Sequence, residues 1–194
     1  MRKVILYMMM TVDGFISGLN GEIDWMVSMD DEKGIEMGLL DQVDTALIGH
    51  GSYKDMAKYW TSAAENPATP KEEVEEVKKI NAITKLVFST TEERLDWNNA
   101  RQVLVKDNID IAEEVVRLKA QPGKDIVLYG SVRLAQTFVQ LNLIDEYRLV
   151  VHPVILGSGK PLFKANQNRI NLKLVSTKND KSGVVLLCYQ PEKK

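Results

Sequence analysis

Apolar residues along this chain fall into short, mostly uninterrupted runs that polar segments separate. The runs cover residues 3–10, 45–49, 85–89, 102–105, 126–129, 146–152, 171–177 and 184–190. Several are apolar throughout rather than alternating with polar residues, which is typical of strands in a sheet that helices cover on both faces. The pattern predicts an α/β fold with a mostly parallel eight-stranded sheet, whose first five strands are parallel and central.

The clearest helix signal begins at Thr69-Pro70-Lys71-Glu72. Thr69 is predicted to cap this helix, Pro70 to occupy its first position and Glu72 to complete a capping box. The face that follows is apolar at helical spacing, with Val74, Val77 and Ile80.

Apolar residues three or four positions apart predict further flanking helices. These helices are marked by Ile35, Leu39 and Val43, by Ile111, Val115 and Leu118, and by Leu134, Phe138 and Leu141. The last two strands are joined by residues 179–183, too few for a crossover helix, and are predicted to form an antiparallel C-terminal hairpin. Residues 61–68 are predicted to form a surface loop.

Composition and charge narrow the function classes. The chain has 194 residues, 44% hydrophobic and 27% charged, which suits one domain spanning 1–194. Its 25 basic and 27 acidic side chains give a net charge of -2, so no field attracts nucleic acid or a membrane surface. No apolar run reaches transmembrane length, which indicates a cytoplasmic protein. Cys188 is interpreted as a buried strand residue, and no metal site is predicted.

Three predicted strands end in glycine or hydroxyl residues. The run 126–129 gives way to a helix at Gly130-Ser131, the run 45–48 does so at Gly49-His50-Gly51-Ser52, and the run 85–88 ends in Ser89-Thr90-Thr91. A helix start offers free N–H groups and a positive dipole end to a phosphate. Three such strand ends predict a ligand with several phosphate or ribose groups, such as a dinucleotide. The Rossmann fingerprint and the P-loop are absent.

Longer motifs carry a family resemblance. Thr11-Val12-Asp13-Gly14-Phe15-Ile16 follows the first strand, Gly130-Ser131 follows the fifth, and a stretch runs from Leu141-Asn142-Leu143-Ile144-Asp145-Glu146 through Pro161-Leu162-Phe163. In this order they resemble the dihydrofolate reductase fold. They are more similar to the carboxyl-terminal reductase domain of the riboflavin-biosynthesis deaminase/reductase RibD and its stand-alone bacterial relatives. The resemblance covers almost the whole chain.

The resemblance implies an NADPH-dependent oxidoreductase that passes hydride to an aminopyrimidine such as a 5-amino-6-ribosylaminouracil phosphate. It implies that the pyrophosphate and adenosine side is held by Gly49, His50, Gly51 and Ser52, and the adenosine ribose with its 2′-phosphate by Ser89, Thr90 and Thr91. The helix start beneath the pyrophosphate and nicotinamide ribose would be formed by Gly130, Ser131, Val132, Arg133 and Leu134. The nicotinamide would be lined by Met9, Thr11, Ile16 and Ser17.

Three polar residues of this set have a second interpretation. His50 would meet a phosphate as a cation or a donor, although the helix dipole disfavours a charged imidazole there and dihydrofolate reductases generally carry arginine at this place. Ser52 is interpreted as an N-cap, a phosphate ligand or both. Arg133, one turn into its helix, is either a solvated cation or a phosphate ligand.

On the substrate side, the resemblance points to Tyr7, Trp25 and Tyr129 as binding residues, and to Asp30 and Tyr129 as catalytic ones. Riboflavin-pathway reductases generally carry lysine where this chain has Tyr7 and glutamate where it has Tyr129, so each tyrosine is either a core residue or a substrate contact. Asp30 is alternatively a helix cap, and Trp25 either closes over the ring or fixes its loop. His152 is interpreted as structural.

Two rival functions remain open. Trp25 and Asp30 favour a dihydrofolate or pterin reductase, whereas the tyrosine replacements favour a non-catalytic NADP(H)-binding module. A homodimer is expected in each case, because stand-alone relatives usually pair and residues 150–156 with Pro161-Leu162-Phe163 form an apolar stretch.

Overall fold

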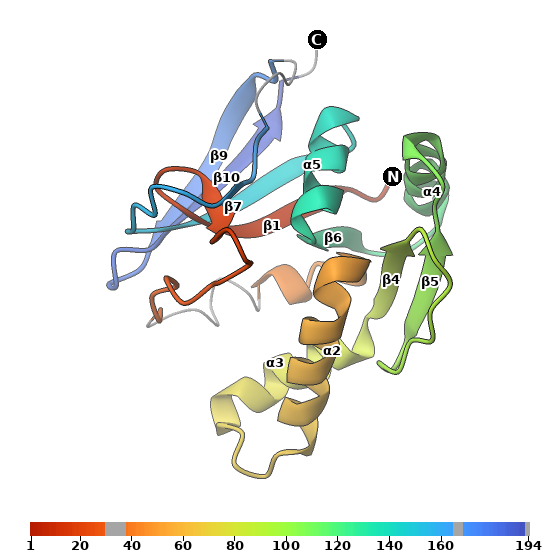
Figure 1. Ribbon diagram of the computed structural model, residues 1–194, viewed down its shortest axis with the longest axis horizontal. Coiled ribbons are helices and arrows are strands. Elements are labelled where there is room, and N and C mark those ends of the chain that lie inside the picture. The colour runs from red at the N-terminus through yellow and green to blue at the C-terminus, as the bar shows by residue number, and fades with distance from the viewer. Residues whose placement is uncertain (30–37, 165–168, 193–194) are drawn as a thin grey trace.

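The computed structural model describes residues 1–29, 38–164 and 169–192, and its main feature is an eight-stranded sheet (Figure 1). The strand order is β5-β4-β3-β6-β1-β7-β10-β9. All strands from β5 to β7 in this order run parallel, and β10 pairs antiparallel with both β7 and β9. The prediction of a mostly parallel eight-stranded sheet with an antiparallel C-terminal hairpin is confirmed.

The elements follow the apolar runs closely. The large sheet consists of β1 (Val4–Thr11), β3 (Val43–Gly49), β4 (Thr84–Ser89), β5 (Ala100–Leu104), β6 (Asp125–Gly130), β7 (Glu146–His152), β9 (Leu172–Asn179) and β10 (Val185–Pro191). The helices are α2 (His50–Glu65), α3 (Lys71–Ala82), α4 (Asn108–Ala120) and α5 (Val132–Gln140). A second, small sheet pairs β2 (Phe15–Ser17) with β8 (Lys160–Pro161), which the apolar pattern does not predict.

Helices cover both faces of the large sheet. Apolar side chains of α4 and α5 pack against one face, and those of α2 and α3 pack against the other. In β1, Leu6 belongs to the first layer and its neighbour Ile5 to the second, and both side chains are almost fully buried. A strand between two such layers has no solvated side, which explains the uninterrupted apolar runs.

Three expectations about the helix pair α2 and α3 are wrong. Helix α2 continues to Glu65, so the first part of the predicted 61–68 loop is helical, and the Thr61 hydroxyl donates to the Ala57 carbonyl at 2.6 Å. Pro70 is the N-cap of α3 rather than its first residue. Thr69 does not cap α3, because its hydroxyl donates to the Ala63 carbonyl of α2 at 2.7 Å.

Two other elements also differ from expectation. Val43 belongs to β3 rather than to a helix, because it pairs with Asp125 of β6; residues 38–40 are helical, and Ile35 lies outside the described residues. Strand β5 is parallel as predicted but lies at the sheet edge rather than in the centre. Its side chains are at most half-buried, as an edge position allows.

The stretch expected at a dimer contact is partly internal and partly exposed. Val150 and Leu162 have no exposed surface in the single chain, whereas Ile155 is 76% exposed and Phe163 is 40% exposed. The free apolar surface is therefore smaller than the sequence indicates, and the homodimer stays a prediction. No helix in the described part of the chain is long and apolar enough to cross a bilayer.

Two buried residues of the sheet are chemically notable. Cys188 is buried in β10, as predicted. Lys85 of β4 is completely buried, and its ammonium donates to the carbonyls of Asn81 at 2.7 Å and Ile83 at 3.0 Å, at the C-terminus of α3. The Lys85 Nζ also lies 4.7 Å from the centroid of the Trp97 ring. Burial lowers the pKa of Lys85 to about 8.

Candidate functional site

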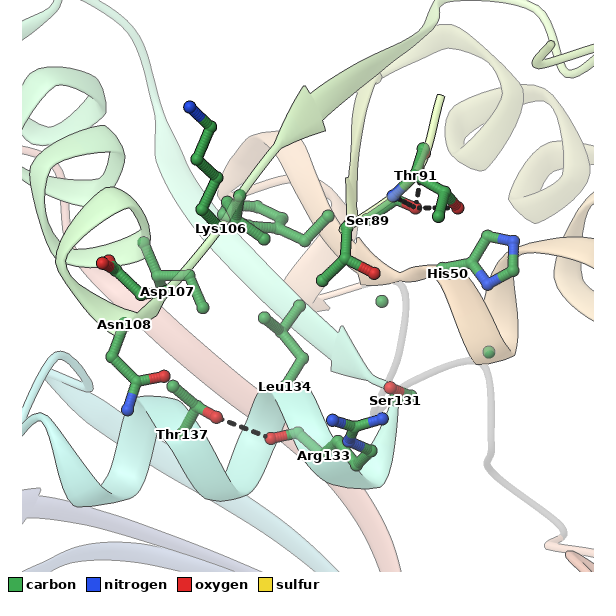
Figure 2. A pocket seen from close by; sticks show the side chains of 16 residues that line it. His50, Ser89, Thr91, Lys106, Asp107, Asn108, Ser131, Arg133, Leu134 and Thr137 are labelled. Carbon is green, nitrogen blue, oxygen red and sulfur yellow. Dashed lines mark hydrogen bonds between the residues drawn. The ribbon is translucent and has the colours of Figure 1, made fainter. Parts of the chain in front are cut away.

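A cavity of about 410 Å³ lies at the carboxyl ends of β3 and β4, between the starts of α2, α4 and α5 (Figure 2). This volume falls within the range of small-molecule sites, about 300–1,000 Å³. Figure 2 shows Ser89, Thr91 and His50 on one side, Asp107 and Asn108 opposite them, and Leu134 and Thr137 of α5 between. The carboxyl edge of a parallel sheet is where open α/β folds bind ligands.

The three helix starts at this cavity differ in their caps. The N-cap of α2 is Gly49 and that of α5 is Ser131, and neither start has a side-chain cap. Helix α4 is capped by Asp107, whose carboxylate accepts from the N–H groups of Ile109 at 2.7 Å and Asp110 at 3.2 Å. The first-turn N–H groups of α2 and α5 are thus left to solvent or a ligand, whereas α4 satisfies two of its own.

Backbone approaches backbone between β3 and α5. A Cβ atom on Gly49 would lie 2.4 Å from Ser131 Oγ and 2.8 Å from Ser131 N. Gly130 has φ +116°, a conformation that L side chains rarely adopt, and its bond to Ser131 is cis. Glycine at both positions is what brings the starts of α2 and α5 together at one edge of the cavity.

The end of β4 supplies hydroxyl groups. Ser89 and the exposed Thr90 and Thr91 line the cavity. The Ser89 hydroxyl accepts from the Thr91 N–H at 3.2 Å and donates to the Thr91 carbonyl at 2.8 Å. Ser89 therefore fixes the turn, while the two threonine side chains remain accessible to a ligand.

Charged side chains stand at the mouth of the cavity. His50 and Arg133 line it from the first turns of α2 and α5, and Lys106 lines it from the segment before α4. His50 Nε2 is in close contact with Glu93 Oε2, and Lys54 Nζ lies 2.9 Å from Glu93 Oε1. Lys54 first and His50 second hold the pKa of Glu93 below its usual value, and Glu93 raises the pKa of Lys54.

The structure gathers most of the predicted cofactor residues around this one cavity. Those that line it are Gly49, His50, Gly51, Ser89, Thr90, Thr91, Ser131, Arg133 and Leu134. Ser52, Gly130 and Val132 are not among the lining residues. Ser52 is the third residue of α2 and so does not cap that helix, and Arg133 is the second residue of α5, in its first turn.

Sequence reasoning missed seven of the residues that line the cavity. They are Phe88 of β4, Thr137 of α5, and Val105, Lys106, Asp107, Asn108 and Ile111 from the β5–α4 connection and the start of α4. An available signal was Asp107 immediately before a helical pattern, because aspartate is a preferred N-cap and strand-to-helix turns of a parallel sheet share one edge.

The residues predicted to line a nicotinamide lie at the end of β1 and in β2, and they do not line this cavity. Met9 is half-buried in β1, whereas Ile16 and Ser17 are buried in β2. The Thr11 hydroxyl donates to the Asp13 carboxylate at 2.5 Å and accepts from the Phe15 N–H at 3.0 Å. Thr11 thus serves the turn between β1 and β2.

The predicted substrate residues lie on one face of the sheet. Tyr7 is buried and contacts the half-buried Tyr129 edge to face, with 6.0 Å between ring centroids. Both pack in or against the same apolar layer as Met29. Tyr7 is therefore part of the core in the single chain, Tyr129 packs against that core, and the substrate role of each stays a prediction. Asp30 lies outside the described residues.

Trp25 is fixed by His152 rather than free at the surface. Both residues are buried, and their rings contact edge to face with 5.4 Å between centroids. His152 Nδ1 accepts from the Val27 N–H at 3.1 Å, so the neutral ring carries its proton on Nε2. Burial lowers the pKa of His152. In the described part of the chain, neither His152 Nε2 nor Trp25 Nε1 has a hydrogen-bond partner.

Comparison with known proteins gives a family and a fold. The RibD C-terminal domain model matches residues 2–186. The uncharacterized protein YyaP of Bacillus subtilis (strain 168) is 46% identical over 188 residues, covering 97% of this chain and 94% of YyaP. A putative riboflavin biosynthesis protein from Shewanella sp. PV-4 matches with a TM-score of 0.75 at 19% identity, over 98% of this chain and 99% of that chain.

A second solved structure is more distantly similar in fold. Dihydrofolate reductase from Enterococcus faecalis, solved with NADP(H), matches with a TM-score of 0.59 at 9% identity, over 98% of this chain and 97% of that chain. At such identity the likeness concerns the fold alone. The predicted dihydrofolate reductase-like fold and the resemblance to the RibD C-terminal domain are confirmed.

Proposed function

The chain belongs to the RibD C-terminal domain family, and from this premise we propose that it is an NADPH-dependent reductase of the riboflavin-biosynthesis type. The proposed substrate is an aminopyrimidine that resembles 5-amino-6-ribosylaminouracil phosphate. The observation that carries the proposal is the convergence of two helix starts without side-chain caps, those of α2 and α5, on one cavity at the carboxyl edge of the sheet.

The bare backbone at this edge suits a pyrophosphate. Because Gly49 has no Cβ, the end of β3 packs directly against Ser131, which brings the two helix starts close enough to share one ligand. Each helix start carries roughly half a positive charge, so the pair offsets about one of the two pyrophosphate charges. Gly51 and Arg133 line the same cavity, and we propose that Arg133 adds the remaining counter-charge.

Two other walls of the cavity, formed by the start of α4 and by the end of β4, suit the uncharged parts of an adenosine. The start of α4 is occupied by the carboxylate of its own Asp107, which makes it a poor seat for an anion. Ser89, Thr90 and Thr91 offer hydroxyl and backbone groups that can bind ribose. We propose that the adenosine half of NADPH lies between these two walls.

For the substrate side, we propose that the edge-to-face pair Tyr7 and Tyr129 borders the aminopyrimidine ring of the substrate. Bound NADPH would supply the hydride, and the side chains would orient the substrate, exclude water and hold one proton. The buried Trp25 packs on His152 at the end of β7, and we propose that it helps to exclude water from the substrate. We keep Asp30, the Tyr129 hydroxyl and a water molecule as candidates for the proton donor.

Steady oxidation of NADPH by the purified chain tests this function. A panel of ribosylaminouracil phosphates, simpler aminopyrimidines, dihydrofolate and oxidised pterins is supplied, and loss of NADPH absorbance is followed. Turnover with a ribosylaminouracil phosphate supports the proposal. Turnover with dihydrofolate alone supports the pterin reductase, and NADPH binding without any turnover supports the non-catalytic module.

A further inference from the structure

One carboxylate that contacts the cavity residue His50 has no part in the proposed function. Glu93 follows β4, with its side chain 25% exposed, and it contacts two basic side chains of α2. These are His50 through Nε2 and Lys54 through Nζ, the latter at 2.9 Å. The three side chains are called the Glu93 cluster below.

The geometry of α2 explains why one carboxylate reaches both groups. His50 and Lys54 are four residues apart at the start of the helix, so their side chains lie on the same face. Glu93 Oε2 contacts His50, and Glu93 Oε1 contacts Lys54. The backbone N–H of Glu93 is held at 3.1 Å by the side chain of Gln102 on β5, which fixes the segment that carries the carboxylate.

The Glu93 cluster adjoins the part of the cavity where an adenosine ribose would lie. His50 belongs to the cluster and lines the cavity together with Thr90 and Thr91. NADPH and NADH differ only in the 2′-substituent of that ribose, a phosphate in NADPH and a hydroxyl in NADH. A phosphate monoester carries about -1.5 to -2 charges at neutral pH, whereas the hydroxyl carries none and can donate to a carboxylate.

We propose that Glu93 is a specificity-determining residue that limits the preference for NADPH over NADH, by engaging His50 and Lys54 and by repelling a 2′-phosphate. The inference rests on the proposed function, because it requires the adenosine ribose in this cavity. Beyond that function, the inference assigns a role to Glu93, which lies outside the cavity lining and would affect the binding of NADPH but not of NADH. A 2′-phosphate would compete with Glu93 for the same two basic side chains, whereas a 2′-hydroxyl would leave the cluster intact.

The main test compares Glu93→Gln with Glu92→Gln. Both variants remove one negative charge, but Glu92 is exposed and makes no ion pair within the described residues. Glu93→Gln is expected to strengthen NADPH binding by about tenfold, as a freed charge-assisted contact would, with NADH affinity unchanged or weaker. Glu92→Gln is expected to change neither. Circular dichroism establishes that both variants are folded.

Nucleotide fragments test the same point without the nicotinamide. Calorimetric titration with adenosine 2′,5′-bisphosphate and adenosine 5′-monophosphate is expected to give the same selective gain in Glu93→Gln, for the bisphosphate only. Lys54→Met removes one cation from the cluster and is expected to weaken bisphosphate binding several-fold without affecting the monophosphate.

Three results would overturn the inference. The first is an unchanged or weaker affinity of Glu93→Gln for NADPH and the bisphosphate. The second is an equal gain in Glu92→Gln, which would make the effect one of overall charge. The third is a wild-type chain that binds none of the four nucleotides, which would remove the proposed function as well. A selective gain in Glu93→Gln together with no NADPH oxidation keeps the inference and overturns only the reductase.

Discussion

Gly49 and Ser131 approach each other so closely that no side chain fits between them: a Cβ on Gly49 would lie 2.8 Å from the Ser131 nitrogen. The two residues end neighbouring parallel strands, or directly follow them, and each is the N-cap of a helix. Their contact therefore sets the distance between two positive helix ends. If those ends bind one pyrophosphate, that distance is a requirement of function.

Replacing Gly49 with alanine should therefore damage cofactor binding. The added methyl group meets backbone, which cannot turn away, so α2 and α5 must separate by several tenths of an ångström. We expect NADPH affinity to fall by more than tenfold, about 1.4 kcal/mol. Gly38→Ala is the control, because a Cβ there would meet nothing within 4 Å and Gly38 does not line the cavity. Equal NADPH affinity in both variants, measured by fluorescence titration, would remove this contact from the account.

Gly130→Val tests the neighbouring strand-to-helix turn. The space around Gly130 admits a Cβ at 3.8 Å from its nearest neighbours, so the cost arises from the backbone at φ +116°. We expect a loss of about 1–3 kcal/mol in the free energy of unfolding and weaker NADPH binding. Gly183→Val, also at positive φ but in the β9–β10 hairpin, should lose stability and keep its NADPH affinity. Normal NADPH binding by a folded Gly130→Val would place the phosphate seat elsewhere.

The sequence predicts the central strands well, because burial on both faces makes a run such as Val4 to Met10 apolar throughout. It also predicts the starts of α2 and α5, because Gly49 and Gly130 end the apolar runs that precede these helices. The sequence does not predict Lys106 and Asn108 as cavity residues, because they reach the cavity only through the position of β5 beside β4. The β2–β8 pair is not predicted either, because two short strands that are distant in sequence leave no periodic signal.

The side chains of the substrate side could not be predicted from spacing. Tyr7 and Tyr129 lie on adjacent strands, and their ring contact depends on the register of β1 against β6. Trp25 and His152 meet only because the segment before residue 30 folds back over the end of β7. No local pattern encodes either meeting, since both are set by long-range pairing.

The buried Lys85 predicts a pH dependence of stability in the alkaline range. Its pKa is about 8 in the folded chain against 10.5 for the free group, so unfolding takes up a proton between these values. The free energy of unfolding therefore gains a contribution from Lys85 that rises with pH from about 8 to 10.5. Lys85→Met should abolish that rise in urea denaturation, whereas Lys78→Met, at an exposed position of α3, should retain it. A rise of equal size in both variants would contradict the assignment.

The buried His152 predicts a pH dependence of stability in the acidic range. Burial keeps its folded pKa below 6.5, so the unfolded chain binds the additional proton and stability falls as pH decreases through 6.5. His152→Gln can still accept from the Val27 N–H through its amide oxygen, and it should flatten the unfolding free energy between about pH 5 and 7. His50→Gln, which changes the only other histidine, serves as the comparison. If His50→Gln alone flattens the profile, the buried-neutral description of His152 is wrong.

Calorimetric titration of NADPH into the wild-type chain tests the central claim most directly, because a bound dinucleotide is what the cavity and the family membership jointly predict. We expect one site per chain, with a dissociation constant of about 1 µM or below and weaker binding of NADH. Equal affinities would remove only the role of the β4 hydroxyls and the α2 cations in holding a 2′-phosphate. Absence of heat with either nucleotide, from a chain shown to be folded, would contradict the account.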